Sequence, residues 1–230
     1  MYMNDRKQLI LNTIIKEYIN TGMPISSGFL VEKYKLDVSP ATVRNDMVYL
    51  ENEGYIMQPH TSAGRIPTEE AYRLYLKKIR DKKISQKDSN LIKDNLGEKN
   101  EYNFKQVAKE ISKILGQTVF WAFHKNNLYY TGISNLLNQP EFKQADVVYD
   151  ISLIIDHMDE TIEKIFEGLP LNENVVLLGS ENPFGDMCGT VMFKYKSGDN
   201  LGMFGIMGPV RMDYQYCLAI ADFIKEELNN

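Results

Sequence analysis

The amino-acid sequence predicts an α+β protein in two parts: a helical N-terminal part that carries a short β-hairpin, and a C-terminal part built on a mostly antiparallel sheet. Two observations predict this class. Apolar residues recur at helical spacing through the first 80 residues, broken by short turns that contain Gly and Pro. Strand-like and helix-like patterns then alternate from residue 104 onward. A chain of 230 residues has room for one large domain or two modest ones.

The first two helices are predicted from their apolar stripes and end signals. Residues 5–21 place apolar side chains on one face, and Gly22 followed by Pro24 ends this helix. Ser26 or Ser27 is suited to cap a second, shorter helix, because a hydroxyl can accept the unpaired N–H groups of a first turn.

A third helix is predicted to begin after Ser39, which serves as its cap. Pro40 stands in the first turn, where a missing N–H group costs nothing. Val43, Met47 and Leu50 follow at spacings of four and three residues, so they share one face. We expect that face to pack against the first two helices.

A β-hairpin is predicted directly after the third helix. The extended runs YIMQP and GRIPT flank the polar segment HTSAG, and a fourth helix opens at TEE with acidic side chains at its positive end. Three helices, a hairpin and a flanking helix are the elements of a winged helix-turn-helix. Residues 1–80 are therefore predicted to form such a domain.

The outward face of the third helix carries side chains suited to DNA. Arg can pair with guanine and Asn with adenine through two hydrogen bonds, and the methyl groups of Ala and Thr can contact thymine. An ordinary solvated helix can show the same residues, but the order of the elements favours double-stranded DNA. The predicted contacts are Ser39, Ala41, Thr42, Arg44, Asn45 and Tyr49 on the helix, and His60, Thr61, Ser62 and Arg65 at the hairpin tip.

The charge distribution agrees with a local contact to DNA. The net charge is −5, which argues against a protein coated in nucleic acid. Residues 1–84 nevertheless carry 13 Lys and Arg against 10 Asp and Glu, whereas the remainder carries 13 against 21. A mildly basic N-terminal part followed by an acidic C-terminal part suits a DNA contact that is made by the N-terminal part alone.

The C-terminal part is predicted to be a separate domain over residues 104–230, joined by a polar linker at 81–103 that includes some helix. Its expected strands and helices alternate along the chain. The strands are expected at 118–124 and 127–133, paired across Lys125 and Asn126, and near 174–179, 189–195 and 200–208; helices are expected at 104–115, within 141–168, and from about 211 to the end.

The sequence predicts no catalytic, cofactor or metal site, and so no enzyme. Cys188 and Cys217 follow no metal-ligand spacing. Gly202, Gly205 and Gly208 do not match a dinucleotide fingerprint, and a closely packed buried strand explains them better. There is no secretory start and no apolar run long enough to span a membrane, so a cytoplasmic protein is expected.

Several segments resemble the HrcA-type heat-inducible transcription repressors of bacteria. The opening ILNTIIKEYINTGMPISS, the helix SPATVRNDM and the hairpin QPHTSAGRIPT carry the resemblance in the first part. GISNLLNQPEF, GSENP and LGMFGIMGPVRMDY resemble the GAF-like C-terminal domain of that family. The resemblance covers roughly residues 3–80 throughout and 128–216 in patches.

This resemblance implies a homodimeric repressor that binds an inverted repeat upstream of chaperone operons, with its active state maintained by the chaperonin. Ser39, Thr42, Arg44 and Asn45 match the family's recognition helix, and His60, Thr61, Ser62, Gly64 and Arg65 match its wing. The chain is shorter than the usual member. Only residues 81–131 occupy the space that normally holds further GAF-like strands and an inserted dimerisation segment, so the C-terminal domain is expected to be abridged.

An alternative hypothesis keeps the DNA-binding domain but replaces the chaperonin with a small molecule as the regulatory signal. The C-terminal domain would then bind a small metabolite. This domain is rich in Met, which fills irregular cores, and GAF-like folds can also hold small ligands; the residues concerned are Met187, Met192, Met203, Met207 and Met212. A thermal-shift screen against metabolites and against the chaperonin separates the two readings.

Overall fold

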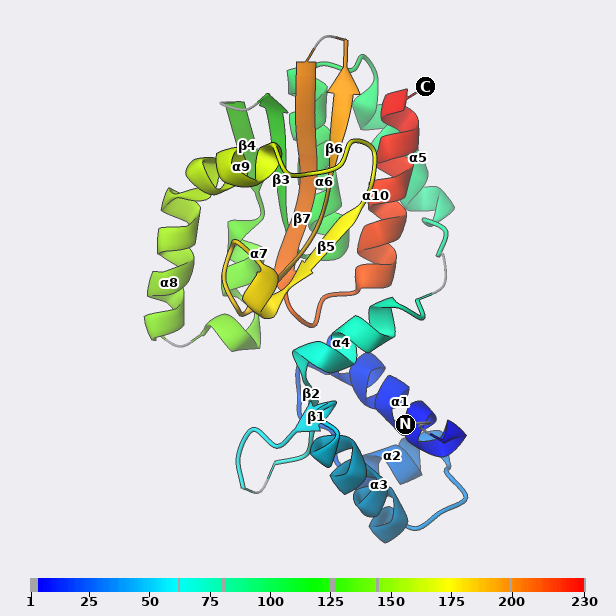
Figure 1. Ribbon diagram of the computed structural model, residues 1–230. Helices are drawn as coiled ribbons and strands as arrows, with labels where there is room; N and C mark the ends of the chain where they lie inside the picture. The colour runs from blue at the N-terminus through cyan, green and yellow to red at the C-terminus, as the bar shows by residue number, and fades with distance from the viewer. Residues whose placement is uncertain are drawn as a thin grey trace. The chain divides into compact units, whose positions relative to one another are not determined.

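The computed structural model folds into two compact units, Met1–Ile79 and Arg80–Asn230 (Figure 1). The structure describes residues 4–61, 63–79, 82–124, 127–143, 145–198 and 200–229.

The first unit contains the predicted elements in the predicted order. Each of its four helices begins at a residue whose side-chain oxygen accepts a backbone N–H of the first turn, so the cap signals in the sequence mark the true helix starts. The elements are α1 (Asp5–Thr21), α2 (Ser27–Tyr34), α3 (Pro40–Asn52), the antiparallel strands β1 (Ile56–Met57) and β2 (Ile66–Pro67), and α4 (Glu69–Leu76).

The core of the first unit forms as the apolar spacing predicts. Val43 and Leu50 of α3 are fully buried, and Met47 is nearly so. They pack with the apolar faces of α1 and α2, where Ile14 and Leu30 are equally inaccessible. One face of α3 is therefore fixed inside the unit, and the opposite face is left outside.

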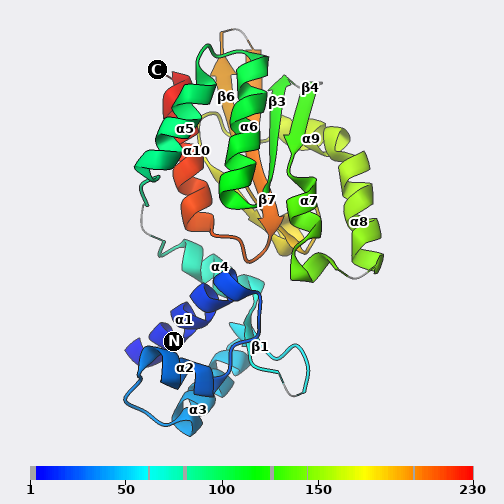
Figure 2. The same cartoon turned by 180° about the vertical axis from the view of Figure 1, so that it is seen from behind.

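The second unit is built on a five-stranded antiparallel sheet in the order β4-β3-β7-β6-β5. Helices α5, α6 and α10 cover one face, and α8 and α9 lie over the other (Figures 1 and 2). The strands are β3 (Thr118–His124), β4 (Asn127–Thr131), β5 (Val175–Leu178), β6 (Cys188–Ser197) and β7 (Asn200–Pro209). The helices are α5 (Gln86–Leu96), α6 (Glu101–Leu115), α7 (Ile133–Leu137), α8 (Ala145–Asp156), α9 (Met158–Phe166) and α10 (Tyr214–Asn229), with short 3-10 turns at Pro140–Phe142 and Gly179–Glu181.

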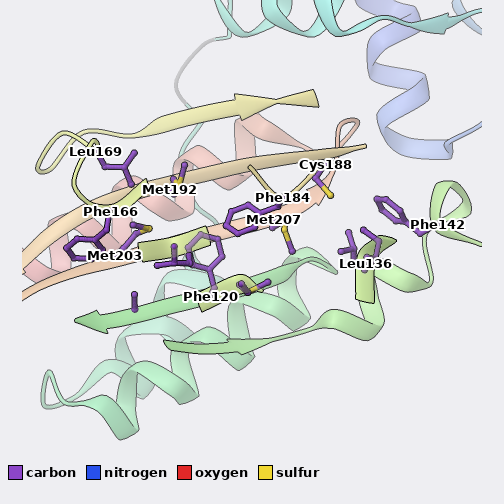
Figure 3. Packing of buried hydrophobic residues seen from close by; sticks show 14 residues of the cluster. Phe120, Leu136, Phe142, Phe166, Leu169, Phe184, Cys188, Met192, Met203 and Met207 are labelled. Carbon is purple, nitrogen blue, oxygen red and sulfur yellow. The ribbon is translucent and has the colours of Figure 1, made fainter. Parts of the chain in front are cut away.

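Alternate residues of each strand point to opposite sides of the sheet. Both sets are buried, because helices cover both faces. Phe120, Met192, Met203 and Met207 belong to the core on the α9 side (Figure 3). These methionines are fully buried in that packed cluster. On the other side, the ring of Trp121 stacks on Phe104 of α6 with centroids 4.6 Å apart.

The glycines of β7 are required by close packing. A Cβ atom on Gly205 would lie 2.0 Å from Cζ of Phe120. One on Gly202 would lie 2.3 Å from Cζ of Tyr195. The closely packed strand expected from the sequence is therefore what the structure contains.

The segment expected to be a linker differs from that expectation. Residues 86–96 form α5, which packs against α6 and belongs to the second unit. Ile92 and Leu96 of α5 are buried, and Lys93 pairs with Glu227 of α10 at 3.0 Å. The reason is physical: a few apolar side chains one turn apart suffice to attach a helix whose other positions are polar.

None of the helices in the described part of the chain is both long and apolar enough to cross a membrane.

Candidate nucleic-acid interface

The N-terminus of α3 is held by its own cap. The Ser39 hydroxyl oxygen accepts the backbone N–H of Thr42 at 3.1 Å and lies 3.0 Å from the Thr42 hydroxyl. Pro40 follows in the first turn. This end of the helix is exposed, and it carries the positive end of the helix dipole, which favours anions such as DNA phosphates.

The outward face of α3 presents the side chains that the sequence predicts. Ala41, Arg44, Asn45 and Val48 are exposed, and Thr42 is half-buried against its cap. Within the described part of the chain, Arg44 has no ion-pair partner and the Asn45 side chain has no hydrogen bond. A guanidinium and an amide that are exposed and uncommitted can both pair with base edges.

Tyr49 lies at the edge of this face. Its ring is half-buried, with the Lys7 ammonium 4.4 Å from the ring centroid. A cation over an aromatic face is attracted by the ring quadrupole. Tyr49 therefore helps to hold α1 against α3, and it brings the charge of Lys7 to the border of the predicted interface.

An ion-pair cluster that sequence reasoning missed lies behind α3. The Asp46 carboxylate is 5% exposed and accepts Nε of Arg6 at 2.6 Å, with Lys7 Nζ at 3.9 Å. The sequence does hold a signal for this cluster, because Asp46 is an acidic residue next to Met47, on the face of the helix that is predicted to be buried. A buried carboxylate requires a cation, and here the cations come from the start of α1.

The hairpin loop is shaped by one amide side chain. Nε2 of Gln58 donates to the carbonyl oxygens of Thr61 and Ala63, each at 3.0 Å, and the Ala63 N–H donates to His60 O at 2.9 Å. His60 and Thr61 are exposed at this tip, as predicted. Ser62, also predicted to contact DNA, lies outside the described residues.

Arg65 is not at the tip, where the sequence analysis expected it. Its backbone bridges to Ile25, with N–H···O distances of 2.8 and 2.9 Å, and this bridge fixes the base of the hairpin. Its guanidinium pairs with Glu51 of α3 at 2.9 Å, and its side chain is only 17% exposed. The expected position was incorrect because the carboxylate of Glu51, fourteen residues earlier in the chain, holds the Arg65 side chain against α3.

Gly64 is required for the same bridge. A Cβ atom at this position would lie 2.4 Å from the Ile25 carbonyl oxygen. The backbone of the hairpin can approach the start of α2 only if residue 64 has no side chain.

A cleft of about 360 Å³ lies between the start of α2, the exposed face of α3 and the hairpin. Its walls include Ser26, Ser27, Arg44, Met47, Gln58 and Thr61. A helix face with free hydrogen-bonding groups beside such a cleft and an exposed loop is an arrangement that fits a nucleic-acid backbone. Among the described residues, no group of His, Cys, Asp and Glu side chains is placed to hold a metal ion.

A buried carboxylate also ties α1 to α2. Glu17 is 3% exposed, and the Lys33 ammonium donates to its two oxygens at 2.7 and 2.8 Å. The Tyr34 hydroxyl donates to the same carboxylate. Hydrogen bonds from Lys33 and then Tyr34 lower the pKa of Glu17 below its usual value, and the bond to Glu17 raises the pKa of Tyr34 to about 12.

Comparison with known proteins agrees with this architecture. The family model "HrcA protein C terminal domain" matches residues 42–217, and a DeoR-like helix-turn-helix model matches residues 12–69. A crystal structure of a protein described only as hypothetical superposes with a TM-score of 0.78, covering 99% of this chain and 98% of the other at 18% identity. That likeness shows a shared fold.

Two similar relatives carry the name heat-inducible transcription repressor HrcA. The protein of Desulforamulus reducens is 28% identical over 337 aligned positions, covering 100% of this chain and 97% of the relative. Because this chain has 230 residues, many of those positions have no counterpart in it. The protein of Clostridium perfringens strain SM101 is 41% identical over 116 residues, covering 50% of this chain and 34% of the relative. With a family model matched over more than half of its length, the chain belongs to the HrcA family.

Proposed function

We propose that the chain is a sequence-specific repressor that binds double-stranded DNA through α3 and the hairpin, and that it acts on heat-shock chaperone genes. The observation that carries this proposal is the exposed pair Arg44 and Asn45, which have no partner in the described part of the chain and stand on a helix whose opposite face is buried. A helix anchored in this way can enter the major groove without losing its packing. The names of the HrcA relatives support the heat-inducible role.

In this proposal α3 reads base edges and its surroundings bind the backbone. Arg44 and Asn45 pair with guanine and adenine, and Ala41 and the Thr42 methyl group contact thymine. The amino end of α3 at Ser39 binds a phosphate, and His60 and Thr61 lie along the neighbouring backbone. Gly64 and Arg65 act indirectly, because they fix the base of the hairpin.

The operator is proposed to be an inverted repeat bound by a homodimer. One recognition helix reads only a few base pairs, and two helices separated by a whole number of DNA turns multiply that selectivity. The second unit supplies the pairing surface. Strand β3 lies inside the sheet with Phe120 and Trp121 buried, whereas β4 is an edge strand whose Tyr130 is 40% exposed. The edge strand is therefore the better candidate.

A response to the chaperonin is the remaining part of the proposal. Its basis is the family to which the chain belongs. The test is to add purified chaperonin to the repressor and measure the fraction of operator bound in a gel shift. We expect that fraction to rise, and an unchanged fraction would reject the response for this shortened chain.

Selection of bound duplexes from a random pool tests the DNA-binding proposal itself. We expect the full chain to enrich one inverted-repeat sequence. Failure of the wild-type protein to enrich any sequence at near-physiological salt, where sequence-independent phosphate binding is weak, would contradict the proposal.

A further inference from the structure

We propose that two copies of the chain join their sheets through β4, which pairs antiparallel with β4 of the second copy around a two-fold axis at Tyr129. This contact rests on the proposed homodimer, and it adds the register of the pairing and the side chains that meet there. In this register Leu128 of each copy lies opposite Tyr130 of the other, and the two sheets become one.

Strand β4 is an open edge of its sheet. It stands at the end of the order β4-β3-β7-β6-β5, so within the described chain its outer N–H and C=O groups have no neighbouring strand. An exposed edge is a template for another strand, and proteins normally protect it with charged side chains or Pro. The strand NLYYT contains neither, and Tyr130 is exposed. This edge is therefore suited to receive a second strand.

The symmetry of an inverted repeat restricts how β4 can pair. Two identical strands related by a two-fold axis normal to the sheet run antiparallel, and residues directly opposite each other point to the same face. Opposite residues must then be an even number of positions apart, because side chains alternate along a strand. The register centred on Tyr129 meets this condition and pairs the whole of Asn127–Thr131.

Helix α6 runs alongside β4 in the same direction. Near the start of both elements, Nδ2 of Asn127 donates to the Glu101 carboxylate at 3.2 Å. One turn later, the Lys105 ammonium lies 5.7 Å from the centroid of the Tyr129 ring. Residues 101 and 105 therefore belong to a row of α6 that faces the β4 edge.

The next member of this row makes the contact complementary in charge. Four residues of helix and two of strand each advance about 6 Å, so Lys109 comes level with Thr131. Lys109 is exposed and has no ion-pair partner among the residues that the structure describes. Because the two-fold axis places Asn127 opposite Thr131 of the second copy, Glu101 of each copy is level with Lys109 of the other. Opposite charges therefore face each other at two symmetric places, which selects a second copy as the partner.

An exposed apolar surface adjoins the open edge. A cleft of about 380 Å³ lies between β4 and the helices α8 and α9, and α8 lies at the β4 side of the unit (Figures 1 and 2). The apolar side chains of the cleft are Leu128, Tyr130, Ile155, Met158 and Ile162, and those exposed on α8 are Val148, Tyr149 and Leu153. Exposed apolar surface of this kind marks a site of association, because covering it removes apolar area from water.

Cysteine cross-linking in the full chain tests the register directly. The two natural cysteines, Cys188 and Cys217, are buried, so an added surface cysteine reacts ahead of them. Residues directly opposite each other have Cβ atoms about 4.5–5.5 Å apart, close to the separation that a disulfide needs. We expect Tyr129→Cys to give a disulfide-linked dimer after mild oxidation with diamide, seen on a non-reducing gel.

Leu128→Cys and Tyr130→Cys are the matched controls. Each variant alone places its two cysteines diagonally across the axis, about 7–8 Å apart, and should give little linked dimer. Co-expression of the two variants brings position 128 opposite position 130 and should restore the cross-link.

Reversal of a charge tests the contact between the α6 helices. Lys109→Glu should raise the dissociation constant of the dimer about tenfold, because it brings like charges together at both symmetric places. Adding Glu101→Lys to the same chain should restore the dimer. Sedimentation velocity measures the association, and thermal melting of each variant confirms that it is folded.

A dimer that does not cross-link at Tyr129→Cys or in the mixed pair of variants would overturn the proposal. Equal cross-linking of all three single variants would also overturn it, because random collision gives that result. In either case the homodimer would stand and use another surface. A wild-type chain that sediments as a monomer both alone and on its operator would instead refute the proposed homodimer, so the two failures can be distinguished.

Discussion

At the residue scale, the proposed DNA recognition depends on the side chains of Arg44 and Asn45. Both are exposed on α3, and neither side chain has a hydrogen-bond or ion-pair partner among the residues that the structure describes. Replacing either with Ala should cost about 1–3 kcal/mol of binding free energy on the operator and relax the preference at one base pair. Gel shifts on the operator and on its single-base variants measure both effects.

The matched control for this prediction is Lys87→Ala, which removes one exposed cation from α5 of the second unit. Its affinity should equal that of the wild type. Wild-type binding by both the Arg44→Ala and Asn45→Ala variants would show that other residues read the bases.

Arg65 is predicted to act through Glu51 on the stability of the hairpin. The pair is partly buried, with side-chain exposures of 17% and 32%. A double-mutant cycle with Arg65→Ala and Glu51→Ala should give a coupling of about 1 kcal/mol in the free energy of unfolding. Additive effects of the two substitutions would show that the ion pair contributes nothing in solution.

At the element scale, the hairpin should depend on the close approach of its base to α2. Gly64→Ala forces a Cβ atom against the Ile25 backbone, at 2.4 Å from its carbonyl oxygen. We expect a loss of about 2 kcal/mol in the stability of the first unit, measured by chemical denaturation. Gly28→Ala is the control, because a Cβ atom there meets nothing within 4 Å, and its stability should match or slightly exceed that of the wild type.

The contact between α1 and α2 should depend on pH through Glu17. Its pKa is lowered in the folded state, so its contribution is present above the ordinary value of 4.5 and is lost as pH falls through the lower, folded value. Glu17→Gln should therefore lower the stability at pH 7 by about 2 kcal/mol. Melting curves recorded from pH 7 to pH 3 should show the difference in melting temperature between Glu17→Gln and wild type becoming smaller. A difference that stays constant would mean that the charge of Glu17 is not responsible.

The sequence predicted most elements because their signals are local. Cap residues and apolar spacing defined α1, α2 and α3, and the strand patterns defined β3 and the β6–β7 pair. Helix α5 was taken for part of a linker, because its polar composition obscured the two buried positions Ile92 and Leu96.

The candidate site was predictable to the extent that it depends on one helix. The exposed face of α3 follows from its buried face alone, and the two agree with the structure. The partners of Arg65 and Asp46 were not predictable, since Glu51 and Arg6 meet them only through tertiary packing.

At the scale of the whole molecule, charge is distributed unevenly along the chain. Residues 1–84 carry a small excess of positive charge, and the remaining residues carry a larger excess of negative charge. An acidic second unit is repelled by phosphates, which agrees with the proposal that this unit pairs with another copy and does not contact DNA. We expect the affinity for the operator to fall linearly with salt on logarithmic axes, with a slope set by the phosphate contacts of the first unit.

The most direct test of the central claim, that the exposed face of α3 reads base edges, is selection of duplexes by wild type and by Asn45→Ala in parallel, followed by footprinting on the winning sequence. For the wild type we expect one inverted repeat with half-sites one DNA turn or a multiple apart, and for the variant we expect relaxed choice at a single symmetric position. Identical selected sequences for both proteins, or no preferred sequence for the wild type, would contradict it.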